Sequence, residues 1–150
     1  MRILISACLL GICCRYDGRS KACAAALELA ERHTLIPVCP EQLGGLPTPR
    51  PPCERRQERV VCRDGSDRTE AYRRGAEQAL RLYKLTHCEC AVLKAHSPMC
   101  GRDSIYDGTF TASLKPGDGV LCGMLRQRGI PVYQEEEIHL LNRKYPNKEI

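Results

Sequence analysis

Four short apolar runs are spaced along the chain, and longer stretches with helical or turn character separate each run from the next. The runs cover residues 2–7, 34–39, 90–95 and 130–134. Each run is five or six residues long and mostly apolar, which is typical of a parallel strand that is buried on both faces. The pattern therefore predicts four central strands.

The stretches between these runs predict helices. Apolar residues recur at helical spacing in 20–33, where Ser20 is placed to cap the helix, and again in 66–87. Two further helices are expected within 115–129 and 136–145. Strands that alternate with helices form right-handed crossovers, so the sequence predicts an α/β protein with a mainly parallel, Rossmann-like four-stranded sheet flanked by helices.

Two segments do not follow this alternation. Residues 40–52 are rich in proline and glycine, so they are expected to form neither a helix nor a central strand. Residues 58–65 have weaker strand character and end in an Asp-Gly turn, which predicts a small edge strand. No linker or low-complexity segment divides the sequence, so we expect one domain that covers residues 1–150.

The composition is that of a soluble globular protein, since 43% of the 150 residues are hydrophobic and 27% are charged. No stretch approaches the ~18–20 apolar residues of a membrane helix, and the apolar N-terminus lacks a signal-peptide cleavage site. A cytoplasmic protein without a membrane contact is therefore expected. The net charge is +5, but the basic residues are dispersed and aromatic residues are few, so a nucleic-acid partner is not expected.

Eleven cysteines are the most unusual feature of the composition. The odd number and the missing secretion signal argue for apolar filler, metal ligands or nucleophiles instead of a disulfide framework. Cys8, Cys39 and Cys100 lie at or just beyond the ends of three predicted strands. Because neighbouring parallel strands end at one edge of a sheet, these three thiols are expected to converge there. Cys23 and Cys122 fall in predicted helices, where an apolar role is expected.

Three converging thiolates suit a metal centre with one open coordination position. Zinc with three protein ligands is one candidate, and a 4Fe–4S cluster with three cysteine-bound irons is the other. The spacing of the cysteines does not choose between them, because none of the three sits in a CxxC ligand repeat. The alternative is that three unrelated cysteines merely pack at strand ends.

Four blocks of sequence around these cysteines together resemble the thiouracil desulfurases, a family of small bacterial iron–sulfur enzymes. The blocks are SACLLG with CRYDG (6–18), PVCPEQLGGLPTPRPP (37–52), LKAHSPMCG (93–101) and IYDGTFTASLKPGDGV (105–120). They follow the order and spacing of the family and span most of the chain, so the resemblance is highly specific. Met99 departs from the family, which more often has a small residue at this position.

The resemblance implies a 4Fe–4S cluster held by Cys8, Cys39 and Cys100, with the fourth iron left for the sulfur of the substrate. It also implies a catalytic acidic residue at Glu41 and a catalytic serine at Ser97. Glu41 would deprotonate water, and Ser97 would hydrogen-bond the substrate or relay a proton. The implied substrate is a thiolated pyrimidine, 2- or 4-thiouracil or its nucleotide, which is converted to the oxo form with release of sulfide and no net redox change.

A non-catalytic iron–sulfur or zinc carrier is the alternative function. Glu41 and Ser97 beside the ligands favour the enzyme, because a carrier needs only the thiolates. His96 is not expected to act as a base, since alternation along the strand turns it away from Ser97. Arg50 could contact a phosphate if the substrate is a nucleotide. The sequence indicates neither the position of the sulfur on the ring nor the oligomeric state.

Overall fold

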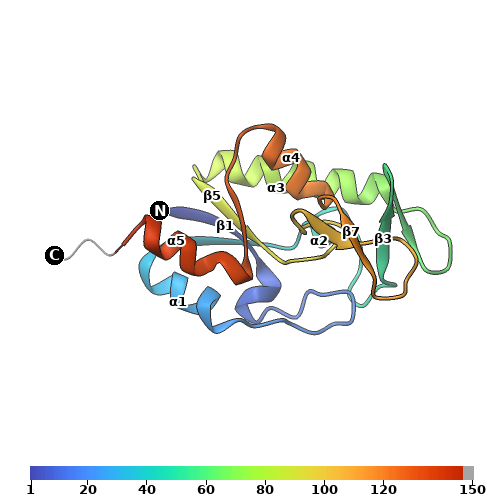
Figure 1. Cartoon of the computed structure of the whole chain (residues 1–150), viewed down its shortest axis with the longest axis horizontal. Coiled ribbons are helices and arrows are strands. Elements are labelled where there is room, and N and C mark those ends of the chain that lie inside the picture. Colours follow the sequence, from blue (N-terminus) through green and yellow to red (C-terminus); the bar gives the residue numbers. More distant parts are fainter. Residues whose placement is uncertain (147–150) are drawn as a thin grey trace.

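The computed structural model describes residues 1–146, and a four-stranded parallel sheet forms its centre (Figure 1). The strands are β1 (Arg2–Ser6), β2 (Thr34–Val38), β5 (Cys90–Leu93) and β8 (Val132–Gln134), in the order β2-β1-β5-β8. Each neighbouring pair is parallel, and β1 lies between β2 and β5. The four predicted strands and the predicted α/β fold class are confirmed.

Helices cover both faces of the sheet. Figure 1 shows α3 (Thr69–Leu85) and α4 (Val120–Gln127) on one side, and α1 (Ala24–Arg32) and α5 (Ile138–Lys144) on the other. A short 3₁₀ helix, η2 (Glu135–Glu137), leads from β8 into α5. This arrangement confirms the prediction that helices flank the sheet.

The residues of β1 explain why both faces need a cover. Leu4 is fully buried in the core that α3 and α4 complete, whereas Ile3 and Ile5 are fully buried in the core that α1 and α5 complete. Successive side chains of a strand point to opposite faces. A strand with apolar side chains on both faces therefore leaves apolar surface exposed to water unless both faces are packed. The continuous apolar runs of the sequence therefore specify a three-layer arrangement.

The first helix begins later than the sequence pattern predicts. α1 starts at Ala24 with Cys23 as its N-cap residue, so the predicted cap at Ser20 is wrong. The preceding segment pairs with a short 3₁₀ helix, η1 (Ala7–Leu10), through the N–H of Lys21, which donates to the carbonyl of Cys8 at 2.9 Å. This tertiary contact holds the backbone before Cys23 away from helical geometry.

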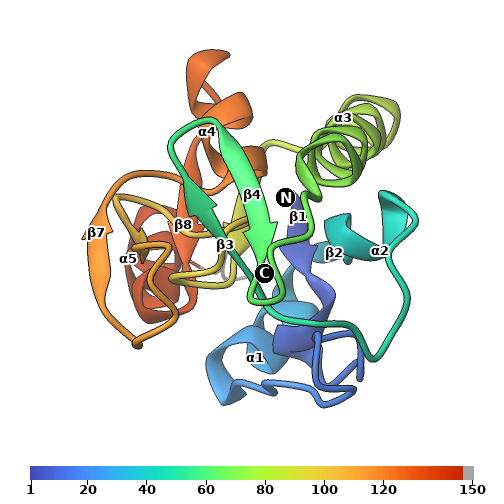
Figure 2. The ribbon, with the colours of Figure 1, turned by 90° about the vertical axis from the view of Figure 1, so that its right-hand side faces the viewer.

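Two small hairpins lie beyond the carboxyl ends of the sheet strands (Figures 1 and 2). β3 (Cys53–Arg56) pairs with β4 (Arg59–Cys62), and β6 (Ser104–Tyr106) pairs with β7 (Leu114–Pro116), both antiparallel. The strand predicted at 58–65 exists as β4, but its placement at the edge of the parallel sheet is wrong. Its partner β3 is only a two-residue turn away, and such local pairing needs no long connection.

The proline-rich segment contains a helical turn that the sequence analysis did not predict. α2 (Pro40–Leu43) begins at a proline, which is tolerated there because the first N–H of a helix has no intrahelical partner. α2 lies against α3 at very short range. A Cβ atom at Gly44 would overlap the carbonyl oxygen of Ala71, and one at Gly75 would overlap the carbonyl oxygen of Pro40. Glycine is therefore required at both crossing points.

The described helices differ from membrane-spanning helices in length or composition. Among residues 1–146, no helix combines the length and the apolar character needed to cross a bilayer. The longest helix, α3, spans 17 residues and alternates buried and exposed positions.

Candidate active site

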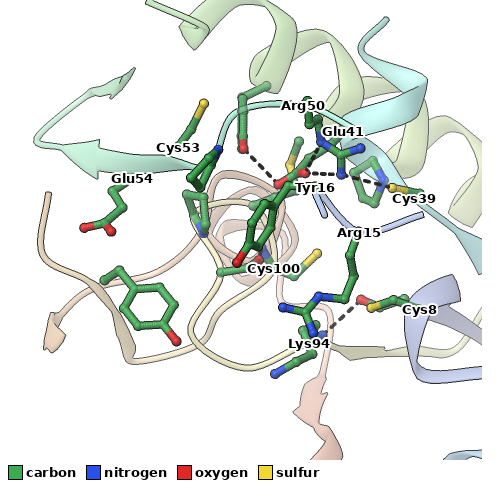
Figure 3. A pocket seen from close by; sticks show the side chains of 18 of the residues that line it. Cys8, Arg15, Tyr16, Cys39, Glu41, Arg50, Cys53, Glu54, Lys94 and Cys100 are labelled. Atoms are coloured by element: carbon green, nitrogen blue, oxygen red, sulfur yellow. Dashed lines mark hydrogen bonds and ion pairs between the residues drawn. The ribbon is translucent and has the colours of Figure 1, made fainter. Parts of the chain in front are cut away.

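The ends of three neighbouring strands border a cavity of about 440 Å³. Cys8 reaches the cavity from η1, which follows β1, and Cys39 directly follows β2. Cys100 lies in the turn that follows β5 (Figure 3). Glu41 and Ser97 line the same cavity. The structure therefore brings together all five residues that the sequence analysis selected.

Cys8 and Cys100 are deeply buried thiols, only 8% and 5% exposed. Burial raises the pKa of Cys8 to about 11, although the positive charge of Lys94 lowers it. Burial also raises the pKa of Cys100 far above its usual range, against the effect of a hydrogen bond with Ser6. Both thiols are therefore protonated at neutral pH, and these protons must leave when a metal binds.

Cys39 has the opposite electrostatic character. A hydrogen bond with the side chain of Cys14 makes the largest contribution to lowering the pKa of Cys39, which falls to about 6 despite its burial. The backbone N–H of Gln42 and the charge of Arg50, whose Nη2 lies 3.9 Å from Cys39 Sγ, act in the same direction. Since the thiolate is the metal-binding form of cysteine, this lowering of the pKa favours Cys39 as a ligand.

The three thiols border one cavity without meeting at one point. Within residues 1–146, no three His, Cys, Asp or Glu side chains are grouped closely enough to hold a single metal ion. The thiols are still near enough to interact, because Cys8 and Cys39 both contribute to the raised pKa of Cys100. An iron–sulfur cluster takes thiolate ligands that are spread around it, so three thiols that line one cavity fit such a cluster.

Glu41 is held at the cavity wall by two side chains from other parts of the chain. The Nε of Arg50 donates to Glu41 Oε2 at 2.8 Å, and Nη2 of Arg50 donates to the same oxygen. The hydroxyl of Tyr72, on α3, donates to Glu41 Oε1 at 2.8 Å. Figure 3 shows Glu41 and Arg50 facing each other next to Cys39. The carboxylate is therefore fixed in position beside a thiol that could hold the metal group.

Arg50 uses its remaining donors on the surrounding loops. Its Nη1 donates to the carbonyl of Pro47 at 3.1 Å and to the hydroxyl of Thr48 at 2.9 Å, and its Nη2 donates to the carbonyl of Cys14 at 2.9 Å. Together with the two bonds to Glu41, these contacts occupy all five guanidinium N–H groups. Within residues 1–146 every N–H group of Arg50 thus already has a protein partner, which argues against the interpretation of Arg50 as a phosphate contact.

Ser97 orders the turn that carries Cys100. Its Oγ accepts a hydrogen bond from the backbone N–H of Cys100 at 2.8 Å, as serine hydroxyls commonly do in turns. The hydroxyl proton of Ser97 is not consumed by this contact, so it is available for a partner in the cavity. Ser97 can thus combine a structural contact with a contact to a ligand.

His96, the residue before Ser97, has a left-handed backbone conformation with φ of 69°. Its Nδ1 lies 3.4 Å from the carbonyl oxygen of Ser104, and its ring lies beside that of Tyr106. These contacts agree with the expectation that His96 is a packed residue instead of a base.

Comparison with known proteins identifies the family. Residues 3–137 match the family model described as 2-thiouracil desulfurase. The chain belongs to the 2-thiouracil desulfurase family. The resemblance inferred from the four sequence blocks is therefore confirmed.

Two individual proteins support this family assignment. One is similar over 147 residues with 37% identity, covering 91% of this chain and 97% of its own length, and it is the "Uncharacterized protein YbbK" of Bacillus subtilis (strain 168). The other is a solved structure, described as a 4Fe–4S-dependent thiouracil desulfidase TudS. It is 43% identical, covers 95% of this chain and 96% of its own, and superposes with a TM-score of 0.86.

Several residues that line the cavity of this thiouracil desulfurase family member escaped the sequence analysis. Among them are Cys53 and Glu54 on β3, and Tyr72 on α3. In the view of Figure 3, Cys53 and Glu54 lie across the cavity from Cys8. A signal for Tyr72 was present, because helical spacing places it on the buried face of the predicted helix over 66–87.

Proposed function

We propose that this protein is a desulfurase that converts a thiolated pyrimidine to the oxo form and releases sulfide, using a 4Fe–4S cluster. The observation that carries the proposal is a single cavity lined by three cysteines from neighbouring strands, a clamped glutamate and a serine. The solved structure that shares 43% identity is described as a thiouracil desulfidase that depends on such a cluster.

Cys8, Cys39 and Cys100 would hold the cluster. Their chemistry fits, because soft thiolates are the usual ligands of iron–sulfur clusters and these three surround a common space. When bound through three cysteines, the cluster supplies an iron with an open position, a soft Lewis acid that polarises a C=S bond and accepts sulfur.

Glu41 would act as the general base. A water molecule gives its proton to the carboxylate, and the electron pair of the broken O–H bond forms the new bond from oxygen to the ring carbon that carries sulfur. As this bond forms, the π electron pair of the C=S bond moves to sulfur. The remaining C–S bond then breaks with its electron pair on sulfur, the new hydroxyl group loses the second proton of the water, and the C=O bond forms, so the oxo base and hydrogen sulfide are released. Because oxygen replaces sulfur at the same carbon, the carbon keeps its oxidation state and no external electrons are required.

Ser97 would bind the substrate or pass a proton to it. Its Oγ already accepts the N–H of Cys100, so its O–H group is left to donate toward a ring nitrogen or the thiocarbonyl sulfur. A donor at this position stabilises negative charge that develops on the ring as water attacks.

One anaerobic assay tests the function. Protein reconstituted with iron and sulfide is incubated separately with 2-thiouracil, 4-thiouracil and 4-thiouridine monophosphate, and both sulfide and the oxo product are measured. Equal amounts of sulfide and uracil or its nucleotide are expected from at least one compound. A protein that keeps an intact cluster but turns over none of the three would instead be a non-catalytic carrier.

A further inference from the structure

Tyr72 is a buried residue whose polar atom points to the candidate base. The residue is 2% exposed, and its ring belongs to the core between the sheet and α3. Its hydroxyl donates to Glu41 Oε1 at 2.8 Å, although the two residues lie 31 positions apart in the sequence. A phenylalanine would fill the same volume, so the packing of the core alone does not require the hydroxyl.

The helix crossing brings Tyr72 to this position. Gly44 and Gly75 allow α2 to touch the backbone of α3, since a Cβ atom at either glycine would overlap a carbonyl oxygen of the other helix. Glu41 lies on α2 and Tyr72 on α3, so the short distance between the helices sets the distance between the carboxylate and the phenol. A glycine inside a helix lowers stability by about 1 kcal/mol relative to alanine. The presence of glycine at position 75 is therefore explained by the close contact with α2.

The hydrogen bonds around Glu41 distinguish its two oxygens. A carboxylate offers about four acceptor positions, two on each oxygen. Arg50 occupies both positions of Oε2 through Nε and Nη2, whereas Tyr72 occupies one position of Oε1. The acceptor position that is left therefore belongs to Oε1, the oxygen that Tyr72 also contacts.

We infer that Tyr72 is a positioning residue that orients Glu41 so that Oε1 takes the proton of the attacking water. The inference rests on the proposed function, because it assigns the atom and the support through which the proposed base works. In the step itself, the water O–H bond breaks, its proton moves to Oε1, and Tyr72 keeps its own proton throughout.

The protonation state of Tyr72 agrees with this role. Burial, and then the negative charge of Glu41, raise the pKa of Tyr72 well above its usual value. The phenol therefore keeps its proton at neutral pH and remains a hydrogen-bond donor, and it does not compete with Glu41 for the proton of the water.

The test compares Tyr72→Phe with Tyr83→Phe in the cluster-loaded protein. Tyr83 lies on the same helix and in the same core, but it does not line the cavity, so it controls for loss of a buried phenol. For Tyr72→Phe, we expect unchanged iron content and KM and a kcat that is lower by about tenfold to a hundredfold, because a misoriented base loses its near-attack geometry. Tyr83→Phe should keep the wild-type kcat.

A double variant tests whether Tyr72 acts through Glu41. If it does, adding Tyr72→Phe to Glu41→Gln should not lower the residual kcat further. An independent additional loss in the double variant, an effect on KM alone, or loss of the cluster from Tyr72→Phe would each overturn the inference.

The failure of the proposed base is distinguishable from the failure of this inference. Wild-type kcat in Glu41→Gln would show that Glu41 is not the base, and it would overturn the inference as well. A large loss of kcat in Glu41→Gln together with wild-type kcat in Tyr72→Phe would overturn the inference alone and leave the base in place.

Discussion

The two sides of the cavity are built in different ways. The thiol side consists of Cys8, Cys39 and Cys100, which the backbone places at the ends of neighbouring strands. On the carboxylate side, Glu41 lies on a helix of four residues, and the side chains of Arg50 and Tyr72 hold it in place.

This difference indicates which structural features support metal binding and which support catalysis. The sheet, whose strand β1 is buried from Ile3 to Ser6, positions the thiols mainly through the backbone. The position of the carboxylate instead depends on side-chain hydrogen bonds from two residues, each of which a single substitution can remove. Changes on the thiol side should therefore remove the metal group, whereas changes on the carboxylate side should leave the metal group and reduce catalysis.

The largest effect is expected from the ligands themselves. Single replacement of Cys8, Cys39 or Cys100 by Ala should abolish turnover and reduce iron from about four atoms per chain to a small remainder, because a cluster needs its thiolates. Iron analysis and the absorption near ~400 nm measure this loss. Cys23→Ala, which changes a half-buried cysteine outside the cavity, is the control. A ligand variant that retained full iron and activity would contradict the assignment of the thiol side.

Glu41→Gln should give the next largest effect. Loss of the base is expected to lower kcat by about 10²-fold or more with the iron content unchanged. The free energy of unfolding should also fall by about 3 kcal/mol, because Arg50, whose side chain is 4% exposed, loses its charged partner.

Glu54→Gln provides a matched control for this variant. Glu54 is a buried glutamate of the same cavity, but its Oε1 accepts the backbone N–H groups of Gly108 and Phe110 at 3.0 and 3.1 Å. Its replacement should reduce stability while kcat stays close to wild type. Equal losses of kcat in both variants would show that Glu41 has no special role.

Ser97→Ala should have a smaller effect on turnover. Removal of one hydrogen bond to the substrate is expected to lower kcat/KM by about tenfold, with most of the iron retained, because the hydroxyl is not a metal ligand. Ser97→Thr keeps a hydroxyl and should recover part of the activity. If Ser97→Ala lost iron in proportion to activity, its contact with the N–H of Cys100 would be its whole contribution.

Two glycine variants should give the smallest effects, and they should change the free energy of unfolding in opposite directions. Gly75→Ala forces α3 away from α2 and should lower the free energy of unfolding by about 1–3 kcal/mol, as overpacking does. Gly123→Ala, in the interior of α4 with ordinary space around it, should raise it by about 0.5–1 kcal/mol. Urea denaturation followed by circular dichroism measures both. A stabilised Gly75→Ala protein would contradict the close helix crossing on the carboxylate side.

The framework and the thiol side could be predicted from local sequence patterns. An apolar run such as residues 2–7 indicates a buried strand without any knowledge of its neighbours. Parallel strands then place their carboxyl ends at the same edge of the sheet. Cys8 and Cys39 follow their strands within two residues, so their positions were set once the strands were recognised. Glu41 and Ser97 were selected because the sequence blocks around them resemble a known family.

The hairpins and the support of Glu41 could not be read from local patterns. β6 and β7 are only three residues long, and the short helix α2 lies in a segment whose prolines argue against a helix. The pairing of Arg50 with Glu41 likewise argues against the suggested phosphate contact, and composition does not show which donors already have partners.

The sequence by itself therefore determined the sheet, the order of its elements and the three thiols at its edge, since these follow from hydrophobic periodicity and strand direction. Only the tertiary structure decided how the carboxylate is held. The hydroxyl of Tyr72 reaches Glu41 because two helices touch at Gly44 and Gly75, and such contact depends on how distant segments pack. Hydrogen bonds between side chains 31 residues apart form only after the backbone has placed both partners.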